Sequence, residues 1–571
     1  MKKFFLYIAA ICVFASCSDF LDTENLTKKD SSVFPANTSD AEEVLTSIYR
    51  PSLGDANLER SSSFLVSELM SDDRFGAGGT DDHAVQAIAS FKKIDENMYA
   101  RFWSLRWEGI YRANFMLKSE PNVNWNSEAD HARVIGETYF MRAYYYFELA
   151  RAFGYVPLVL TPDPVNNPQA DPADLYGQIA SDLKTAIEML PATKWSAGSG
   201  VGTDGHATKW AAEALLARVF LFYTGYYKTE SIALPEEGGT LTKADVVGYV
   251  DDCVANSGHS LLPEFRNLWP YTAAKDYKYN DDNHLSWIGE NGDNPEAVFV
   301  VKHSGNDWSA RNNEALFFSL RYQDEGGNKW MDCYPYGSGW GCGSVNTELY
   351  EAWQSDPDYA GDIRRTGSIL NVDDPAEGIK AYVDGAQNQV QDTHLWNKKY
   401  TAISTKSDDP TVETYLGTGI EPLTWHLYPS LNTLDYQSNN IQDYYVIRFA
   451  DVLLMGAELG SSHAQQYFDT VRKRVNLPSI TCSLENIQKE RRYELAFEGI
   501  RYYDLLRWHQ ENLITEHRKD ITVYNQKNKV KLSVPFRTET KGFLPIPDQE
   551  IQKSQGVLKQ NEGWASNEGN F

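Results

Sequence analysis

Acidic and basic side chains alternate closely near the C-terminus, where residues 489–508 read KERRYELAFEGIRYYDLLRW. Carboxylates and cations at such short spacing could form an acid and base array for catalysis. The same spacing could instead pair charges within a buried helix, because residues three apart on a helix are neighbours. Three of the acids have an arginine at that distance, in the pairs Arg491 with Glu494, Arg501 with Glu498 and Arg507 with Asp504.

Apolar residues cover almost every remaining face of this helical pattern, which is typical of a helix enclosed by protein. A buried ion needs a partner, since breaking one buried pair costs roughly 3–5 kcal/mol. The pairing therefore favours a structural ion network over catalysis for residues 489–508.

The first residues of the chain predict secretion and lipid attachment. Lys2 and Lys3 precede an apolar run that ends at Phe14, which is shorter than the roughly 20 residues needed to cross a bilayer. Small residues then precede Cys17, a pattern that resembles a bacterial lipobox. We expect residues 1–16 to be removed as a signal peptide and acyl chains on Cys17 to hold the protein on a membrane. Cleavage and secretion without a lipid is the alternative.

The chain is acidic, with a formal net charge of −26 over 571 residues. Because Lys2 and Lys3 would leave with the signal peptide, the mature chain would carry −28. An acidic surface repels polyanions, so nucleic acid, heparin-like chains and anionic lipid are unfavourable ligands and neutral ligands fit better.

The remaining cysteines do not indicate a metal site. Four of the six stay in the mature chain without a lipid: Cys253, Cys333, Cys342 and Cys482. They form no CxxC pair with neighbouring histidines, and no stretch matches the twelve-residue calcium loop, so we expect no metal and no other cofactor. The close spacing of Cys333 and Cys342 leaves open whether these two form a disulfide.

Long helical patterns dominate the first half of the chain, in residues 128–153, 172–190, 206–227 and 243–256. Two of them share a phrase, ELARAFG at 148–154 and LLARVFL at 215–221. Small alanines on one helix admit large side chains from its neighbour, so stacked helix pairs bury a continuous core. The pattern predicts an irregular array of the tetratricopeptide type.

The pattern changes over residues 258–442, which hold short extended pieces separated by Gly, Asn, Asp and Pro. This stretch is rich in aromatic residues, which favours a functional excursion over a linker. We therefore predict a mainly α chain, with a helical scaffold at about 36–257 and 443–512 and an inserted loop-rich ligand-binding region at about 258–442. The proline-marked tail, 513–571, is predicted to pack as coil.

Five motifs in one order resemble the SusD/RagB family of lipoproteins of the Bacteroidetes. They are CSDFLD at 17–22, WEGIYRANFML at 107–117, RFADVLLMGAEL at 448–459, ERRYELAFEGIRYYDLLRW at 490–508 and FLPIPDQEI at 543–551. The resemblance covers nearly the whole chain and implies a tetratricopeptide-like scaffold from which an irregular ligand-binding region projects.

The resemblance also implies a cellular location and a function. Members of this family are lipid-anchored on the outer membrane, face the cell surface, bind oligosaccharides and act as a lid on a SusC-like TonB-dependent transporter. The family has no catalytic residue to carry over, which again favours a structural role for residues 489–508 and implies that the protein is not an enzyme.

Sugars present apolar C–H faces and hydroxyl edges, so a glycan site needs flat aromatic rings and short polar side chains. Residues 328–343 read NKWMDCYPYGSGWGCG and form a glycine-broken loop with no apolar period to bury its rings. We predict that its aromatic residues bind the ligand: Trp330, Tyr334, Tyr336 and Trp340. The alternatives are packing within the inserted region and contact with the transporter.

A second candidate region lies near the N-terminus, at residues 54–62 and 71–82. It places short polar groups near glycines, suited to bidentate bonds with vicinal hydroxyls. The predicted ligand-binding residues are Asp55, Asn57, Asp72, Asp73, Arg74 and Asp81. The family resemblance implies that this part of the chain approaches the binding face, and solvated turns are the alternative.

These observations predict a cell-surface glycan-binding lipoprotein that captures neutral oligosaccharides and delivers them to a TonB-dependent transporter. Two alternatives stay open: a peptide-capturing lipoprotein of the same fold, and a secreted glycoside hydrolase, which needs two carboxylates roughly 5–10 Å apart across a cleft. The sequence has no GxSxG, HExxH or Gly-rich phosphate motif, which removes the commoner hydrolase and nucleotide sites.

Overall fold

The computed structural model describes residues 34–53, 62–195, 205–236, 238–289, 294–303, 311–323, 332–407, 420–422, 440 and 442–564. The predicted signal peptide and lipidation site Cys17 lie outside these residues, as do three predicted ligand-binding residues, Asp55, Asn57 and Trp330.

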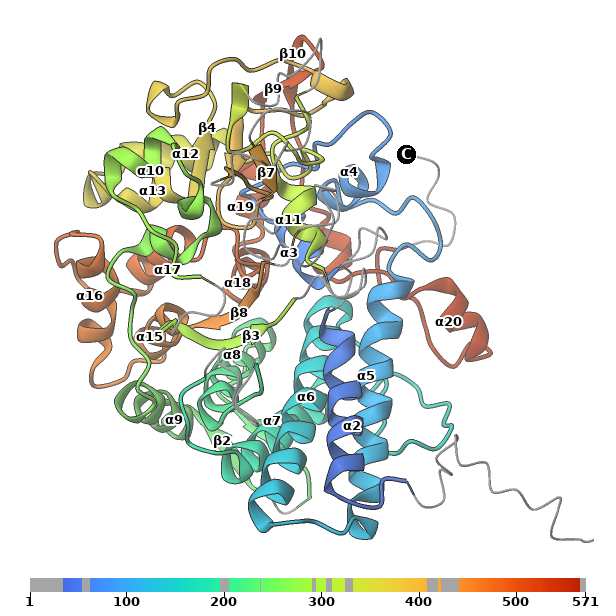
Figure 1. Ribbon diagram of the computed structural model, residues 1–571. Helices are drawn as coiled ribbons and strands as arrows, with labels where there is room; N and C mark the ends of the chain where they lie inside the picture. Colours follow the sequence, from blue (N-terminus) through green and yellow to red (C-terminus); the bar gives the residue numbers. More distant parts are fainter. Residues whose placement is uncertain are drawn as a thin grey trace, which may run out of the picture.

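Long helices form one half of the molecule, drawn from blue to green in the lower part of Figure 1. Their bounds are α2 (Thr38–Tyr49), α5 (Ala100–Ser119), α6 (Glu128–Phe153), α7 (Pro172–Met189), α8 (Lys209–Tyr227) and α9 (Lys243–Asn256). From α5 onward, each packs against the next one in the chain. Stacking of successive helices buries a continuous core, and the predicted mainly α scaffold is confirmed.

Short polar side chains fix where these helices begin. Ser127, Asp171, Thr208 and Thr242 each accept a hydrogen bond from a backbone N–H in the first turn of the helix that follows. Such caps satisfy donors that have no partner inside the helix. The predicted bounds of these four helices agree with the structure to within one turn.

One glycine allows the first helices to approach closely. A Cβ at Gly109 of α5 would lie 2.2 Å from the ring of Tyr145 on α6, so no larger residue fits there without a shift. Tyr145 is fully buried, and its hydroxyl donates to the carbonyl of Ile48 on α2 at 2.6 Å. The contact therefore joins three helices of the scaffold.

The scaffold continues after the inserted region with α15 (Phe449–Glu458), α16 (Ala464–Arg474), α17 (Leu484–Glu494) and α18 (Arg501–Arg507). Helix α15 packs on α9, and α18 packs on α8. Chain segments far apart in sequence thus complete one helical layer.

The prediction of one continuous helix over residues 489–508 is wrong, because the chain turns between α17 and α18. Phe497 and Gly499 have φ values of 66° and 74°, in the left-handed region that ends a helix. The Gly499 N–H donates instead to the carboxylate of Glu68 at 2.7 Å. An apolar pattern that goes round all faces gives no sign of this turn, since both helices are buried.

The other half of the molecule holds short elements separated by loops, in the upper part of Figure 1. Its α-helices are α3 (Ser63–Leu69), α4 (His83–Ala89), α10 (Lys278–Asn283), α11 (Asn313–Phe318), α12 (Thr347–Ser355), α13 (Ile363–Ser368) and α19 (Asn512–His517). Single 3₁₀ turns occur in both halves: η2 (Arg50–Leu53), η3 (Glu120–Asn122), η4 (Phe265–Leu268), η5 (Pro270–Ala273), η8 (Pro357–Tyr359), η9 (Pro375–Glu377), η10 (Ala386–Asn388) and η13 (Thr538–Thr540).

The strands form antiparallel pairs and no larger sheet among the described residues. The pairs are β1 (Ser231–Ala233) with β2 (Thr240–Thr242), β3 (Ala297–Val301) with β8 (Tyr444–Arg448), β4 (Ile369–Asn371) with β5 (Leu395–Asn397), β6 (Ser404–Lys406) with β7 (Ile420–Pro422), and β9 (Ile521–Asn525) with β10 (Asn528–Leu532). The pair of β3 and β8 connects the inserted region to the scaffold, because β3 lies within that region and β8 directly follows it.

The tail beyond residue 512 contains regular structure where the sequence predicted coil. The hairpin of β9 and β10 turns at residues 526–527, and α20 (Asp548–Lys553) lies beside α5 at the edge of the molecule (Figure 1). These elements are short, and strands of five residues give a weak periodic signal. No helix among the described residues is long and apolar enough to span a membrane.

The acids of residues 489–508 form a buried ion network at the junction of the two halves. Glu490 accepts from Arg364 at 2.5 Å and from Arg472 at 2.9 Å. Glu494 accepts from Arg364 at 2.8 Å and from Arg448 at 2.9 Å. The carboxylates are therefore bound to cations from other segments, as expected of a structural role.

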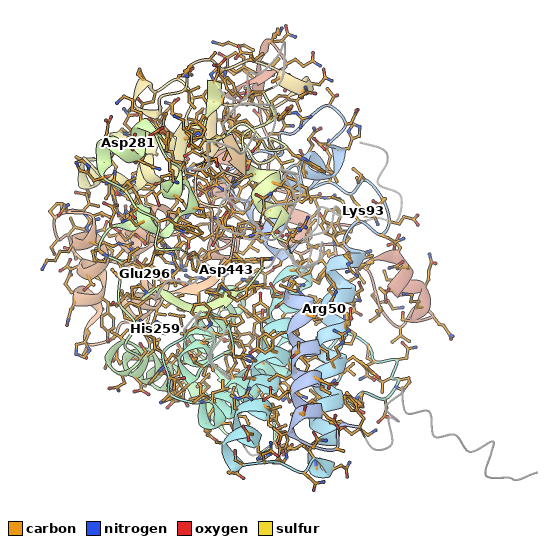
Figure 2. The ribbon with its side chains drawn as sticks, in the orientation of Figure 1. Arg50, Lys93, His259, Asp281, Glu296 and Asp443 are labelled. Carbon is orange, nitrogen blue, oxygen red and sulfur yellow. The ribbon has the colours of Figure 1, made fainter. Side chains whose placement is uncertain are left out.

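The network extends into the inserted region. Arg448, at the end of β8, donates to Glu498 at 2.7 Å and to Glu296 at 2.8 Å. Figure 2 shows Glu296 at the level where the two halves meet, next to β3. Burial raises the pKa of Glu494, but Arg474, Arg448 and Arg364 outweigh burial and hold that pKa well below its usual value.

Of the three pairs predicted from spacing, one is present. Arg507 donates to Asp504 at 2.8 Å, whereas Arg491 pairs with Asp451 and Asp504, and Arg501 pairs with Asp72. The turn at residues 495–500 separates α17 from α18, and most of the partners come from distant parts of the chain.

Candidate functional site

The aromatic loop is held by backbone hydrogen bonds to the end of α11 and to the residues that follow it. Trp340 N–H donates to the Leu316 carbonyl at 2.9 Å, and Cys342 N–H donates to the Phe317 carbonyl at 2.7 Å. A Cβ at Gly339 would lie 2.0 Å from the Cβ of Ser319, so the two backbones approach more closely than other residues allow. The glycines of the loop thus fix its position.

The two regions predicted separately lie side by side. Gly78 N–H donates to the Gly341 carbonyl at 2.6 Å, and Gly343 N–H donates to the Gly76 carbonyl at 2.9 Å. The chain near residue 77 pairs with Cys342 in an isolated antiparallel bridge. Backbone hydrogen bonds therefore join residues 75–82 to residues 339–345, and most of both segments is buried. Thr80, Asp81 and Trp340 are the residues of these segments that are not buried. We call this junction, together with Tyr334 of the same loop and Arg321, the loop platform.

The rings of the loop differ in exposure. Tyr336 is fully buried, with its ring 5.8 Å from that of Tyr277. Tyr334 is half-buried and donates its hydroxyl to the Lys275 carbonyl. Trp340 is also half-buried, and its ring packs at 5.2 Å from Phe317. Among the described rings of this loop, Tyr334 and Trp340 retain the surface that a ligand would need.

Cys333 and Cys342 are not joined by a disulfide. Both thiols are buried, and Cys333 Sγ donates to the Ala381 carbonyl at 3.1 Å. Burial raises the pKa of Cys333 to about 12, so the thiol stays protonated. The loop is held by its backbone hydrogen bonds instead of a covalent bridge.

Asp72, Asp73 and Arg74 lie beneath the platform, fully buried or nearly so. Asp72 accepts two bonds from Arg501, both at 2.8 Å. Burial raises the pKa of Asp72, but Arg501 and Arg492 outweigh burial and hold it well below its usual value. These contacts indicate that Asp72 anchors α18 under the platform.

The next two residues, Asp73 and Arg74, are also bound to charged side chains of the protein itself. Asp73 accepts from Arg492 at 2.9 Å, and Arg74 donates to Glu68 at 2.6 Å. Burial, together with the like charge of Asp72, raises the pKa of Asp73 to about 6 despite Arg492. Asp81, in contrast, is exposed at the rim of the platform and is able to reach a ligand.

Arg321 is a platform residue that the sequence did not predict. Its guanidinium donates to Asp82 at 3.3 Å and to the Gln387 carbonyl at 3.0 Å, so it joins three chain segments. Gln389 donates to the Gly341 carbonyl at 3.0 Å from the same side. Arg321 is a single arginine after the segment FFSL and belongs to no recognisable motif, so nothing in the sequence indicated its role.

The platform combines half-buried rings, an exposed carboxylate and a guanidinium fixed by its neighbours. Such a surface can stack on an apolar face and bond to hydroxyls. Among the residues that the structure describes, no group of three His, Cys, Asp or Glu side chains could hold a metal ion. The arrangement is suited to binding.

Comparison with known proteins places the chain in a family. A family model described as "SusD family" matches residues 295–564, and a second, described as "Starch-binding associating with outer membrane", matches residues 19–221. The chain belongs to the SusD-like family.

Named relatives agree with this assignment. SusD-like protein P2 of Formosa agariphila is 23% identical over 509 residues, which cover 84% of this chain and 83% of that protein. A SusD-like protein of Bacteroides ovatus is 24% identical over 538 residues, which cover 89% of this chain and 83% of that protein.

Solved structures share the fold over most of its length. A laminarin-binding SusD-like protein superposes with a TM-score of 0.66 at 27% identity, covering 92% of this chain and all of its own. Surface glycan-binding protein A from Bacteroides fluxus gives a TM-score of 0.69 at 24% identity, covering 93% of this chain and all of its own. The same-named protein from Bacteroides thetaiotaomicron, in complex with laminarihexaose, gives 0.67 at 20% identity, covering 92% of this chain and 99% of its own.

Proposed function

We propose that the protein is a cell-surface glycan-binding lipoprotein that captures a neutral oligosaccharide on the loop platform and passes it to a TonB-dependent outer-membrane transporter. The observation that carries the proposal is the backbone pairing of residues 75–82 with residues 339–345, which brings the half-buried Trp340 and the exposed Asp81 to one junction. A laminarin-binding relative with the same fold supports a glucan or similar glycan as the ligand.

Charge supports a neutral ligand. The chain carries −26 before processing, and the carboxylates beneath the platform are bound by the protein's own arginines. A polyanion would meet repulsion at the surface, whereas a hydroxyl can donate to a carboxylate and accept from a guanidinium group.

Attachment to the membrane supports capture with modest affinity. A lipid on Cys17 would hold the platform near a transporter, and the resulting effective concentration makes tight binding unnecessary. The protein needs no catalytic residue for this role. Replacement of Cys17 by Ser should release the protein from membranes, as a fractionation experiment would show.

Affinity electrophoresis and calorimetry of residues 18–571 with laminarihexaose and other neutral glycans test the proposal. Trp340→Ala and Asp81→Ala should each weaken binding, by about tenfold for the ring. Tyr155→Ala is a matched control, since Tyr155 is 42% exposed and its ring packs at 6.2 Å from that of Phe543, outside the platform. Equal affinity of the Trp340 and control variants for every glycan, with unchanged melting, would contradict the platform as the site.

A further inference from the structure

An open groove lies on the helical half of the molecule, away from the loop platform. Its volume is about 570 Å³, and it is lined by α5, by residues 157–167 between α6 and α7, and by α20 with the chain after it. Small-molecule sites commonly have volumes of about 300–1,000 Å³. We call it the α5 groove.

Three aromatic residues follow one face of α5 along the groove: Trp103, Trp107 and Tyr111. They are four residues apart, so they lie above one another on the helix. Trp103 is buried and its ring packs at 5.8 Å from that of Trp107. Tyr111 is 55% exposed, the highest value among the large apolar side chains that the structure describes. The floor of the groove is thus held in place by core packing, and the exposed ring of Tyr111 lies at its rim.

The opposite wall adds polar groups that can bond to hydroxyls. Asn166 donates one amide N–H to the Ser554 carbonyl at 3.1 Å, and Asn167 donates one to the Leu158 carbonyl at 3.1 Å. These bonds fix both side chains, and within the described residues no other hydrogen bond occupies either amide. An amide both donates and accepts, which matches a hydroxyl.

The charges around the groove cancel locally. Asp163 is bound by Lys118 at 2.8 and 2.9 Å, and Glu550 is bound by Lys553 at 2.6 Å. A charged ligand would therefore gain no net attraction here, and a neutral one would meet no repulsion.

From the row of rings, the amides and the paired charges, we infer that the α5 groove is a second saccharide site, which takes a short neutral oligosaccharide with one ring stacked on Tyr111. An extended peptide fits less well, because peptides commonly add to a strand edge and no described strand lines the groove. The site is separate from the loop platform and needs no contribution from it.

A pair of variants separates the two sites. Saturation-transfer NMR would be measured with a panel of laminari-, cello-, malto-, xylo- and manno-hexaose on full-length mature protein carrying Trp340→Ala, which weakens the platform. At least one sugar should still give a signal, and addition of Tyr111→Ala should weaken that binding by about five- to tenfold. The double change Asn166→Ala with Asn167→Ala should weaken it as well, without removing any ring.

Tyr155→Ala serves as the control, because it removes another exposed ring outside the groove lining. Failure of every sugar in the panel to show a Tyr111-dependent signal overturns the inference. Tyr111-dependent binding of a mixed peptide library, with no such dependence for sugars, also overturns it and identifies a peptide as the occupant. Loss of binding by Tyr111→Ala with no effect of Trp340→Ala would sustain the groove and reject the platform.

Discussion

Several charged side chains near the candidate site act as interior partners of one another. Asp72 and Asp73 stand near glycines in a polar stretch, where ligand contact was a reasonable prediction, yet both are buried against arginines of α17 and α18. The sequence identifies polar residues near turns. It cannot show which of them are already bound by cations more than 400 positions away.

Glu213 on α8 is a buried acid whose charge is only partly balanced by a cation. Its nearest cation, Lys209, lies 3.4 Å away and is shared with Asp252, and neither carboxylate oxygen has a hydrogen-bond partner. Burial raises the pKa of Glu213 from 4.5 to about 8. The folded protein therefore holds a proton that the unfolded chain releases at lower pH.

We predict a stability difference that depends on pH for Glu213→Gln. The stabilising contribution of Glu213 to the free energy of unfolding is fully present below about pH 4.5. It is lost as the pH rises through about 8, because the pKa of Glu213 is higher in the folded state than in the unfolded state. At pH values above 8 the variant should be more stable than the original protein by about 1–3 kcal/mol, in urea unfolding. Glu188→Gln, an exposed change on α7, is the control. The same difference at low and high pH would refute the argument.

At the scale of elements, the turn between α17 and α18 decides where the charges go. The residues on either side are helical, and Gly499 occupies a φ of 74° that a side chain disfavours. A Cβ there would lie 2.8 Å from the ring of Phe64. The turn thus depends on glycine for both conformation and space.

Gly499→Ala should destabilise the protein by about 1–3 kcal/mol, because it adds strain and a clash at a buried turn. Gly248→Ala is the matched control. It lies inside α9 with no atom within 4 Å of the added Cβ, so it should be neutral or stabilising by up to about 1 kcal/mol. Chemical unfolding of both variants gives the comparison. Equal effects of the two changes would mean that the turn tolerates a side chain.

Periodicity predicts the long helices because their apolar faces and caps are local features. It does not predict the turn at Gly499, since burial on all sides removes the contrast between faces. The loop platform was half predicted. Both of its segments were chosen for rings and polar groups near glycines, and the runs GAGG at 76–79 and GSGWGCG at 337–343 allow their backbones to meet. That they meet each other follows only from the fold.

At the scale of the whole molecule, the ion network connects the inserted region to the helical scaffold. Arg448 is the last residue of β8, and its partners are Glu296, directly before β3, Glu494 at the end of α17 and Glu498 in the turn after α17. Asp443, labelled near β8 in Figure 2, binds Lys302 at 2.7 Å and supports the same strand pair. The two halves are therefore joined at the pair of β3, inside the inserted region, and β8, directly after it.

Arg448→Met tests whether this junction stabilises the whole fold. The change keeps much of the side-chain length but leaves Glu296, Glu494 and Glu498 with less positive charge, and loss of one buried partner costs about 3–5 kcal/mol. Lys118→Met is the control, since Lys118 and Asp163 form an ion pair at the surface, where pairs contribute about 0–1 kcal/mol. Urea unfolding should shift strongly for Arg448→Met alone.

If the junction serves the whole molecule, tryptophan fluorescence and helical circular dichroism should still change together in that variant. Separate transitions would mean that the scaffold remains folded while the inserted region opens, and that the network stabilises only the ligand-binding half.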